Sequence, residues 1–238
     1  MDVYLDHAAS TPARPEVVEA MMPWLAEHPG NPSGAHRVAR NARRAIDDAR
    51  DTIAELLGSD PGEVVFTSGG TESDNLAVDG VLGAHGGVAI CGATEHPAVL
   101  DPVELSGGIV VPTDRMGCID LTALSATLDS SSEIRLVSIM AVNNETGVVN
   151  NIPDAASVVA KISPGTFLHT DAVQAAAWMD LREICSGAHL VSLTGHKIGG
   201  PKGAGVLVLR GGTSICLLYT SDAADEGLGV DLGGRRII

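Results

Sequence analysis

Apolar positions along this chain fall into two kinds of segment that alternate. Short runs rich in valine, isoleucine and leucine have the length and composition of buried strands, at 63–67, 88–91, 109–111, 134–142, 166–170, 190–193 and 205–209. Longer segments repeat apolar residues at helical spacing, at 15–27, 33–57, 72–82, 97–105, 121–128 and 153–162. This alternation predicts an α/β fold with a mainly parallel sheet and helices on both faces.

The turns that end the predicted strands are the places to expect chemistry, because ligands of open α/β sheets bind outside the carboxyl ends of the strands. The turn F-T-S-G-G-T-E-S at 66–73 offers the backbone N–H groups of Gly70 and Thr71 at a positive helix N-terminus, which favours a phosphate. A glycine turn in which Thr71 only caps the helix is the structural alternative. The spacing is not that of a P-loop, so nucleotide hydrolysis is not predicted.

A lysine enclosed by glycines follows the strand at 190–193. In the run T-G-H-K-I-G-G at 194–200, the glycines allow the backbone to approach a ligand closely. Lys197 could form an imine with a carbonyl cofactor. A lysine in a loop is more often solvated, so the reactive interpretation depends on the neighbouring strand ends.

Two further strand ends carry polar side chains, Asp171 with Gln174 and, one strand earlier, Asn144. Each of these residues could simply form a turn. Pyridoxal 5′-phosphate (PLP) would give every feature a role, with a carboxylate at the ring nitrogen, amides at the ring hydroxyl, a phosphate cup and a lysine for the aldehyde. Four such features at successive strand ends predict a PLP site.

His96 is the remaining candidate, in the turn before the helix at 97–105. A histidine in such a turn is more often a capping or packed residue than a catalyst. In a PLP site it could stack on the ring or move protons. No partner at ligand spacing accompanies it, so we expect no metal site.

Composition excludes several classes of function. Fifteen lysines and arginines against 30 carboxylic acids give a net charge of −15, which disfavours nucleic acid as a partner. No apolar run approaches the roughly 20 residues of a spanning helix, so we expect no membrane insertion and a cytoplasmic protein. The four cysteines are far apart and form no C-x-x-C pair, which favours buried structural thiols in a reducing compartment.

The same residues, with Y-L-D-H-A-A-S-T-P at 4–12 and G-N-P-S at 30–33, resemble the class V aminotransferase superfamily, and specifically the NifS-like cysteine desulfurases. The resemblance runs from Val3 to about Arg210. It implies the large domain of a PLP-dependent transferase of the aspartate aminotransferase type. Enzymes of this family take sulfur from L-cysteine, release L-alanine and hold the sulfur as an enzyme-bound persulfide for iron–sulfur cluster or thio-cofactor biosynthesis. A sulfur-acceptor or scaffold protein and a homodimeric full-length enzyme are the implied partners.

The resemblance also implies a role for each candidate residue. Lys197 would form the imine with PLP and then shuttle the substrate proton, Asp171 would pair with the ring nitrogen, and His96 would lie over the ring as stacker and acid/base. Asn31 would bind substrate. The phosphate would be held by Gly70, Thr71, Thr194 and His196, and the ring hydroxyl by Asn144 and Gln174.

The sequence departs from the family pattern in several places. Gly199 stands where an aromatic residue is common, and Thr194 replaces a usual serine. The family's sulfur-accepting cysteine and substrate-carboxylate arginine lie in a C-terminal region with no counterpart here. We therefore expect the small C-terminal domain to be missing and this chain by itself to be inactive. A selenocysteine lyase, another class V aminotransferase or lyase, and a non-catalytic PLP-binding fragment stay open as alternatives.

We expect three segments: an N-terminal segment at 1–14, a PLP-binding large domain at 15–215 that is incomplete at its C-terminal end, and a tail at 216–238. The tail, C-L-L-Y-T-S-D-A-A-D-E at 216–226 and G-V-D-L-G-G-R-R-I-I at 229–238, resembles the translation of a transposase sequencing adapter. We expect it to be foreign to the protein and exclude it from the fold. A natural divergent tail is the alternative.

Overall fold

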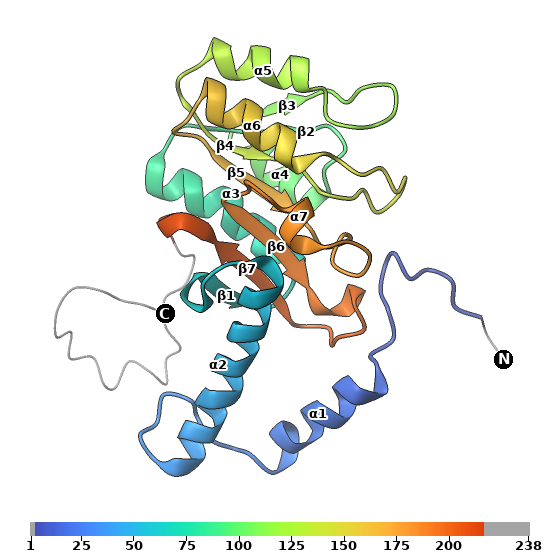
Figure 1. Cartoon of the computed structure of the whole chain (residues 1–238), viewed down its shortest axis with the longest axis vertical. Helices are drawn as coiled ribbons and strands as arrows, with labels where there is room; N and C mark the ends of the chain where they lie inside the picture. The colour runs from blue at the N-terminus through green and yellow to red at the C-terminus, as the bar shows by residue number, and fades with distance from the viewer. Residues whose placement is uncertain (1–2, 217–238) are drawn as a thin grey trace.

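A single seven-stranded sheet forms the centre of the structure, a computed structural model that describes residues 3–216 (Figure 1). The strands lie in the order β1-β7-β6-β5-β4-β2-β3. Neighbours from β3 to β6 pair in parallel, whereas β7 pairs antiparallel with both β6 and β1. The predicted α/β class with a mainly parallel sheet is confirmed. The strand bounds are β1 Val64–Thr67, β2 Val88–Gly92, β3 Ile109–Val111, β4 Ile134–Ser138, β5 Phe167–Asp171, β6 Leu190–Thr194 and β7 Gly205–Leu209.

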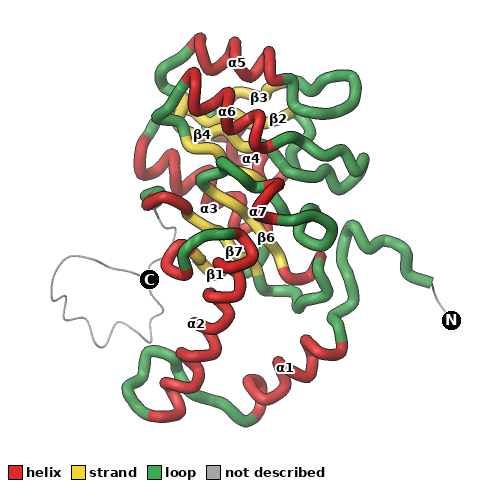
Figure 2. The backbone as a smooth tube through the Cα atoms, in the orientation of Figure 1, coloured by secondary structure: helices red, strands yellow, loops and turns green. Residues whose placement is uncertain are grey.

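Helices flank this sheet, as the tube in Figure 2 shows. Their bounds are α1 Pro15–Ala26, α2 Arg37–Leu57, α3 Gly70–His85, α4 Pro97–Leu105, α5 Leu121–Ser130, α6 Ile152–Ile162 and α7 Leu181–Ile184, with short 3₁₀ turns η1 Pro61–Glu63, η2 Gly195–Lys197 and η3 Arg210–Gly212. The short helix α7 was not predicted, because four residues are too few to show helical periodicity. No helix within 3–216 is both long and apolar enough to cross a bilayer.

Two apolar layers hold the helices on the two faces of the sheet. On one face α2, α5, α6 and α7 pack against strand residues that include Val137 and Val191, and on the other face α3 and α4 pack against Leu136 and Leu190. Adjacent residues of one strand point to opposite faces, so a strand buried on both sides is apolar throughout. This is why the strands are visible in the sequence as continuous apolar runs.

Helix α1 and the start of α2 lie apart from this double layer. Helix α1 has no buried residue, and α1 and the first half of α2 extend away from the sheet (Figure 1). Residues 4–14, which precede α1, lie along the loop after β6, where the Thr11 N–H donates to the His196 carbonyl and the Arg14 N–H donates to the Gly199 carbonyl. At the other end, the expected tail lies outside the described residues except for Cys216, whose N–H donates to the Gly80 carbonyl of α3.

Candidate functional site

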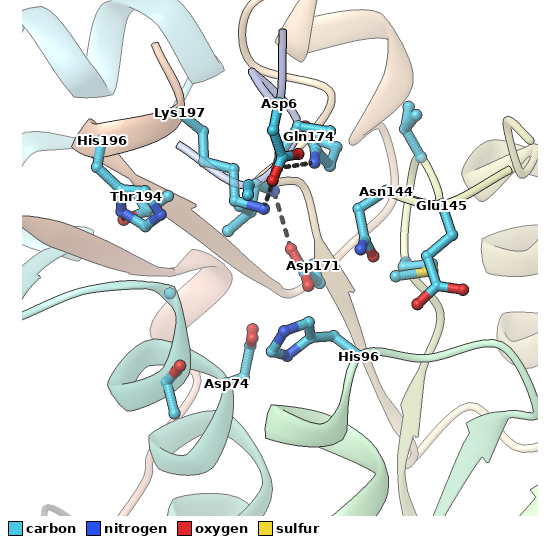
Figure 3. A pocket seen from close by; sticks show the side chains of 17 residues that line it. Asp6, Asp74, His96, Asn144, Glu145, Asp171, Gln174, Thr194, His196 and Lys197 are labelled. Carbon is cyan, nitrogen blue, oxygen red and sulfur yellow. Dashed lines mark hydrogen bonds between the residues drawn. The ribbon is translucent and has the colours of Figure 1, made fainter. Parts of the chain in front are cut away.

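The carboxyl ends of the central strands open into a cavity of about 480 Å³ (Figure 3). Residues far apart in the sequence converge there because parallel strands end at the same edge of the sheet. Of the ten residues predicted for the site, nine line this cavity: Gly70, Thr71, His96, Asn144, Asp171, Gln174, Thr194, His196 and Lys197.

Asn31, the tenth residue, is not among the cavity-lining residues. It lies exposed between α1 and α2, where its Oδ1 accepts a hydrogen bond from the Ser33 N–H at 2.9 Å. Its substrate-binding role stays a prediction.

The N-terminus of α3 forms one wall. Gly69 precedes the helix and no side chain caps it, so Thr71 is not the N-cap that the structural alternative required. A Cβ on Gly70 would lie 2.9 Å from Val173 Cγ2, and only glycine allows so close an approach to the turn after β5. The exposed N–H groups of this helix start suit an anion.

Hydroxyl and imidazole groups border the same wall. Thr194 Oγ1 lies 3.0 Å from His196 Nδ1, and a Cβ on Gly69 would lie 3.9 Å from that hydroxyl. Burial, with Lys197 and Lys202 adding to it, lowers the pKa of His196, which favours the neutral imidazole. Helix N-terminus, hydroxyl and imidazole therefore meet in one corner that fits a phosphate.

The N-terminal segment holds the lysine. Lys197 Nζ donates to the Ala8 carbonyl at 2.7 Å, and Gln174 Nε2 donates to the same oxygen at 2.8 Å. Burial lowers the pKa of Lys197, while Asp171 and Asp6 act in the opposite direction. A lowered pKa increases the share of neutral amine, which is the form that attacks a carbonyl carbon.

Asp171 lies between Lys197 on one side and His96 on the other (Figure 3). It is only 6% exposed, and its Oδ1 accepts a hydrogen bond from the Val173 N–H at 2.9 Å. Burial raises the pKa of Asp171, and the Val173 N–H, His96 and Lys197 each pull that pKa down. A buried carboxylate of this kind is suited to a cationic partner inside the cavity.

His96 both caps a helix and lines the cavity. Its Nδ1 accepts a hydrogen bond from the Ala98 N–H at 3.1 Å at the start of α4. In a neutral imidazole the proton then lies on Nε2. The capping role considered from the sequence is therefore present together with a position at the cavity, and it fixes which ring nitrogen carries the proton.

Several groups of the site were missed in the sequence. Asn143 holds the turn that presents Asn144, since its Oδ1 accepts from the N–H groups of Glu145 and Thr146 and its Nδ2 donates to the Thr94 carbonyl. Asp74, from α3, lines the cavity, although an acid in a helix is usually a surface residue. The motif at 4–12 contributes to the family resemblance, but its sequence does not show that the Ala8 carbonyl contacts Lys197.

The donor set fits PLP. An amine, a buried carboxylate and an anion-binding corner surround one cavity, and they match the aldehyde, ring nitrogen and phosphate of that cofactor. Within residues 3–216, no cluster of three or more histidine, cysteine, aspartate or glutamate side chains is arranged to hold a metal ion. The fold thus matches the large domain of the PLP-dependent transferases, and the residues of the site fit that cofactor.

Comparison with known proteins gives the family. Residues 3–214 match the family model Aminotransferase class-V, and the chain belongs to that family. Its relatives within the family include cysteine desulfurases of the IscS type, and its structural neighbours include NifS-like proteins. The chain is 43% identical over 219 residues to the IscS-like cysteine desulfurase of Mycobacterium tuberculosis, covering 87% of this chain and 55% of the relative. It is 41% identical over 222 residues to the cysteine desulfurase IscS of Dictyoglomus turgidum, covering 90% and 55%.

Solved structures agree with this placement. A NifS-like protein aligns with a TM-score of 0.87 at 33% identity, over 93% of this chain and 62% of that one. A structure described as SspA in complex with cysteine aligns with a TM-score of 0.84 at 33% identity, over 93% and 65%. The chain spans about half the length of the curated relatives it matches, and 55% of the Mycobacterium tuberculosis and Dictyoglomus turgidum proteins.

Proposed function

We propose that this chain is the PLP-binding half of a cysteine desulfurase, an enzyme that converts L-cysteine to L-alanine and keeps the sulfur as a persulfide. The observation that carries the proposal is the position of Lys197, Asp171 and the α3 N-terminus around one cavity. Iron–sulfur cluster or thio-cofactor biosynthesis would receive the sulfur through an acceptor or scaffold protein. The full-length enzyme would be a homodimer.

Each residue would act on PLP through the group it presents. Lys197 Nζ would bind the aldehyde, and Asp171 would pair with the protonated ring nitrogen. PLP, when bound, supplies an electron sink for charge that develops at the substrate α-carbon. Lys197, once released from the aldehyde, would take and return the α-proton, and His96 Nε2–H would lie over the ring as a second proton donor. The phosphate would be held by Gly70, Thr71, Thr194 and His196, and the ring hydroxyl by Asn144 and Gln174.

Reductive trapping tests this assignment. The chain contains only three lysines, Lys161, Lys197 and Lys202. We expect borohydride reduction of the PLP-treated chain to leave the cofactor on Lys197 alone, which peptide mass spectrometry can show. Modification of Lys161 or Lys202 in place of Lys197 would contradict the assignment.

A second candidate concerns this polypeptide itself, which we propose binds PLP without desulfurating cysteine. None of its cysteines lines the cavity. Burial raises the pKa of Cys91 to about 12 and that of Cys185 to about 11, so neither is a thiolate at neutral pH. The Cys118 Sγ lies 3.7 Å from the Val149 carbonyl oxygen. The Cys216 N–H donates to the Gly80 carbonyl of α3.

Sulfide assays distinguish this candidate from an active enzyme. We expect the PLP-loaded chain to release no sulfide from L-cysteine in the presence of a reductant, because no thiol within the described residues can receive sulfur in the cavity. A full-length cysteine desulfurase serves as the positive control. Sulfide release that disappears in Lys197→Ala would show that this chain is active by itself.

A further inference from the structure

A buried carboxyl group faces the cavity and has no part in the function proposed above. Asp74 lies near the start of α3, is 2% exposed and points toward Asp171 from below (Figure 3). Its Oδ1 has no hydrogen-bond partner among the described residues. A buried carboxylate oxygen without a partner is unfavourable, whereas a protonated carboxyl group removes the charge.

His169 lies beside Asp74 but would not neutralise a negative charge on it. His169 Nε2 lies 3.6 Å from Asp74 Oδ1, and the ring is fully buried. Two serine hydroxyls occupy its nitrogens, with Ser138 Oγ 2.7 Å from Nδ1 and Ser192 Oγ 2.9 Å from Nε2. Burial lowers the pKa of His169 to about 3, so the imidazole is neutral.

Two other buried carboxyls face Asp74. Asp171 reaches it from β5, and Glu95, which is 7% exposed, faces it from the turn after β2. Glu95 Oε1 accepts a hydrogen bond from the Met140 N–H at 2.6 Å, and its Oε2 has no partner among residues 3–216. Three negative charges in one buried region would repel one another strongly.

The basic side chains near these three carboxyl groups act on Asp171. Both Lys197 and His96 lower the pKa of Asp171, and no cation within residues 3–216 lowers that of Asp74 or Glu95. Burial and then Asp171 raise the pKa of Asp74 well above its ordinary value, while the Ser192 hydroxyl acts in the opposite direction. The other titratable groups that line the cavity are Asp6, Glu145 and His196. The cations that favour an ionised carboxyl in this region therefore act on Asp171.

We propose that Asp74 is a positioning residue whose carboxyl group stays protonated. Of the buried carboxyl groups of Asp74, Glu95 and Asp171, only that of Asp171 then carries a negative charge. This role rests on the proposed function, because Asp171 is the group assigned to the ring nitrogen. With Asp74 neutral, the Asp171 carboxylate would pair with the protonated ring nitrogen of PLP. An ionised Asp74 would raise the proton affinity of Asp171. The protonation state itself can be tested without any cofactor.

The test compares the wild-type chain with Asp74→Asn, whose amide resembles a neutral carboxyl group and cannot ionise. In the unfolded chain the Asp74 carboxyl ionises at about pH 4. A raised folded pKa gives a stabilising contribution that is complete below the unfolded pKa and is lost as pH rises toward the folded pKa. The wild-type unfolding constant should therefore rise about tenfold per pH unit relative to Asp74→Asn over this window.

Urea unfolding of both chains from about pH 4 to neutral pH, without PLP, measures this ratio. Asp79→Asn, which removes an exposed carboxyl from the same helix, controls for the loss of one negative charge. A ratio that does not change with pH, or that falls as pH rises, overturns the proposal.

If Asp74→Asn does not fold, carbon-13 NMR of the aspartate-labelled wild-type chain gives a second measurement. A carboxyl carbon assigned to Asp74 that keeps its protonated chemical shift at neutral pH supports the proposal. Ionised shifts for all aspartates overturn it. Because neither measurement uses PLP, a failure of PLP binding counts against the proposed function and not against this inference.

Discussion

Replacing Lys197 by alanine should abolish the covalent attachment of PLP completely. Among residues 3–216, Lys197 is the only lysine that lines the cavity. The groups around the α3 N-terminus would remain, so weak non-covalent binding through the phosphate is compatible with the loss. The measurement is the visible absorbance of the PLP-treated chain, followed by its mass after borohydride reduction.

Lys202→Ala is the matched control for that experiment. Lys202 lies five residues further along the same loop, is exposed, and borders a separate cleft with Tyr4 and Pro201. We expect Lys202→Ala to keep both the absorbance and the reducible adduct. A Lys197→Ala chain that folds and still carries a reducible adduct would remove the lysine from the mechanism.

Replacing Asp171 by asparagine should weaken PLP binding by roughly 30- to 4,000-fold. Removing one partner of a buried, hydrogen-bonded charge pair costs about 2–5 kcal/mol, and each 1.4 kcal/mol is about tenfold in affinity. Asparagine keeps the size of the side chain and can still accept the hydrogen bond from the Val173 N–H. The loss would therefore report the missing charge and not a missing contact. Titration of the chain with PLP, followed by absorbance, gives the affinity.

Asp101→Asn provides the control for this variant, because it removes an exposed carboxyl from α4 outside the cavity. Its affinity for PLP should equal that of the wild-type chain. An Asp171→Asn chain with unchanged affinity would show that the ring nitrogen does not rely on this carboxylate. The pyridine of PLP would then be held without its proton.

The sheet could be predicted because its strands are buried on both faces. The run at 190–193 and the strand β6 differ by a single residue at one end, and the run at 205–209 coincides with β7. The run at 134–142 was too long, since β4 ends at Ser138. Ile139, Met140 and Ala141 are buried beyond the strand, and an apolar run cannot distinguish a strand from a buried irregular segment.

The short loop before β7 agrees with its antiparallel direction, whereas the place of β1 beside β7 could not be predicted from the pattern. β7 returns antiparallel beside β6 after the lysine loop at 195–204, and β1 pairs antiparallel with β7. A parallel neighbour needs a longer crossover, usually a helix, and this loop contains only the short turn η2. The order of strands follows from contacts between distant segments, which hydrophobic periodicity does not encode.

The sequence by itself determined the α/β class and the strand ends at which Asp171, Thr194 and Lys197 lie, because strand length, periodicity and glycine turns are local properties. Only the tertiary structure decided which groups face those residues. The Ala8 carbonyl accepts a hydrogen bond from Lys197 Nζ, although the two residues lie near opposite ends of the sequence. Asp74, on helix α3, lines the cavity. Hydrogen bonds to backbone atoms and the burial of a single carboxyl group depend on how distant elements pack, and no residue pattern along the chain records them.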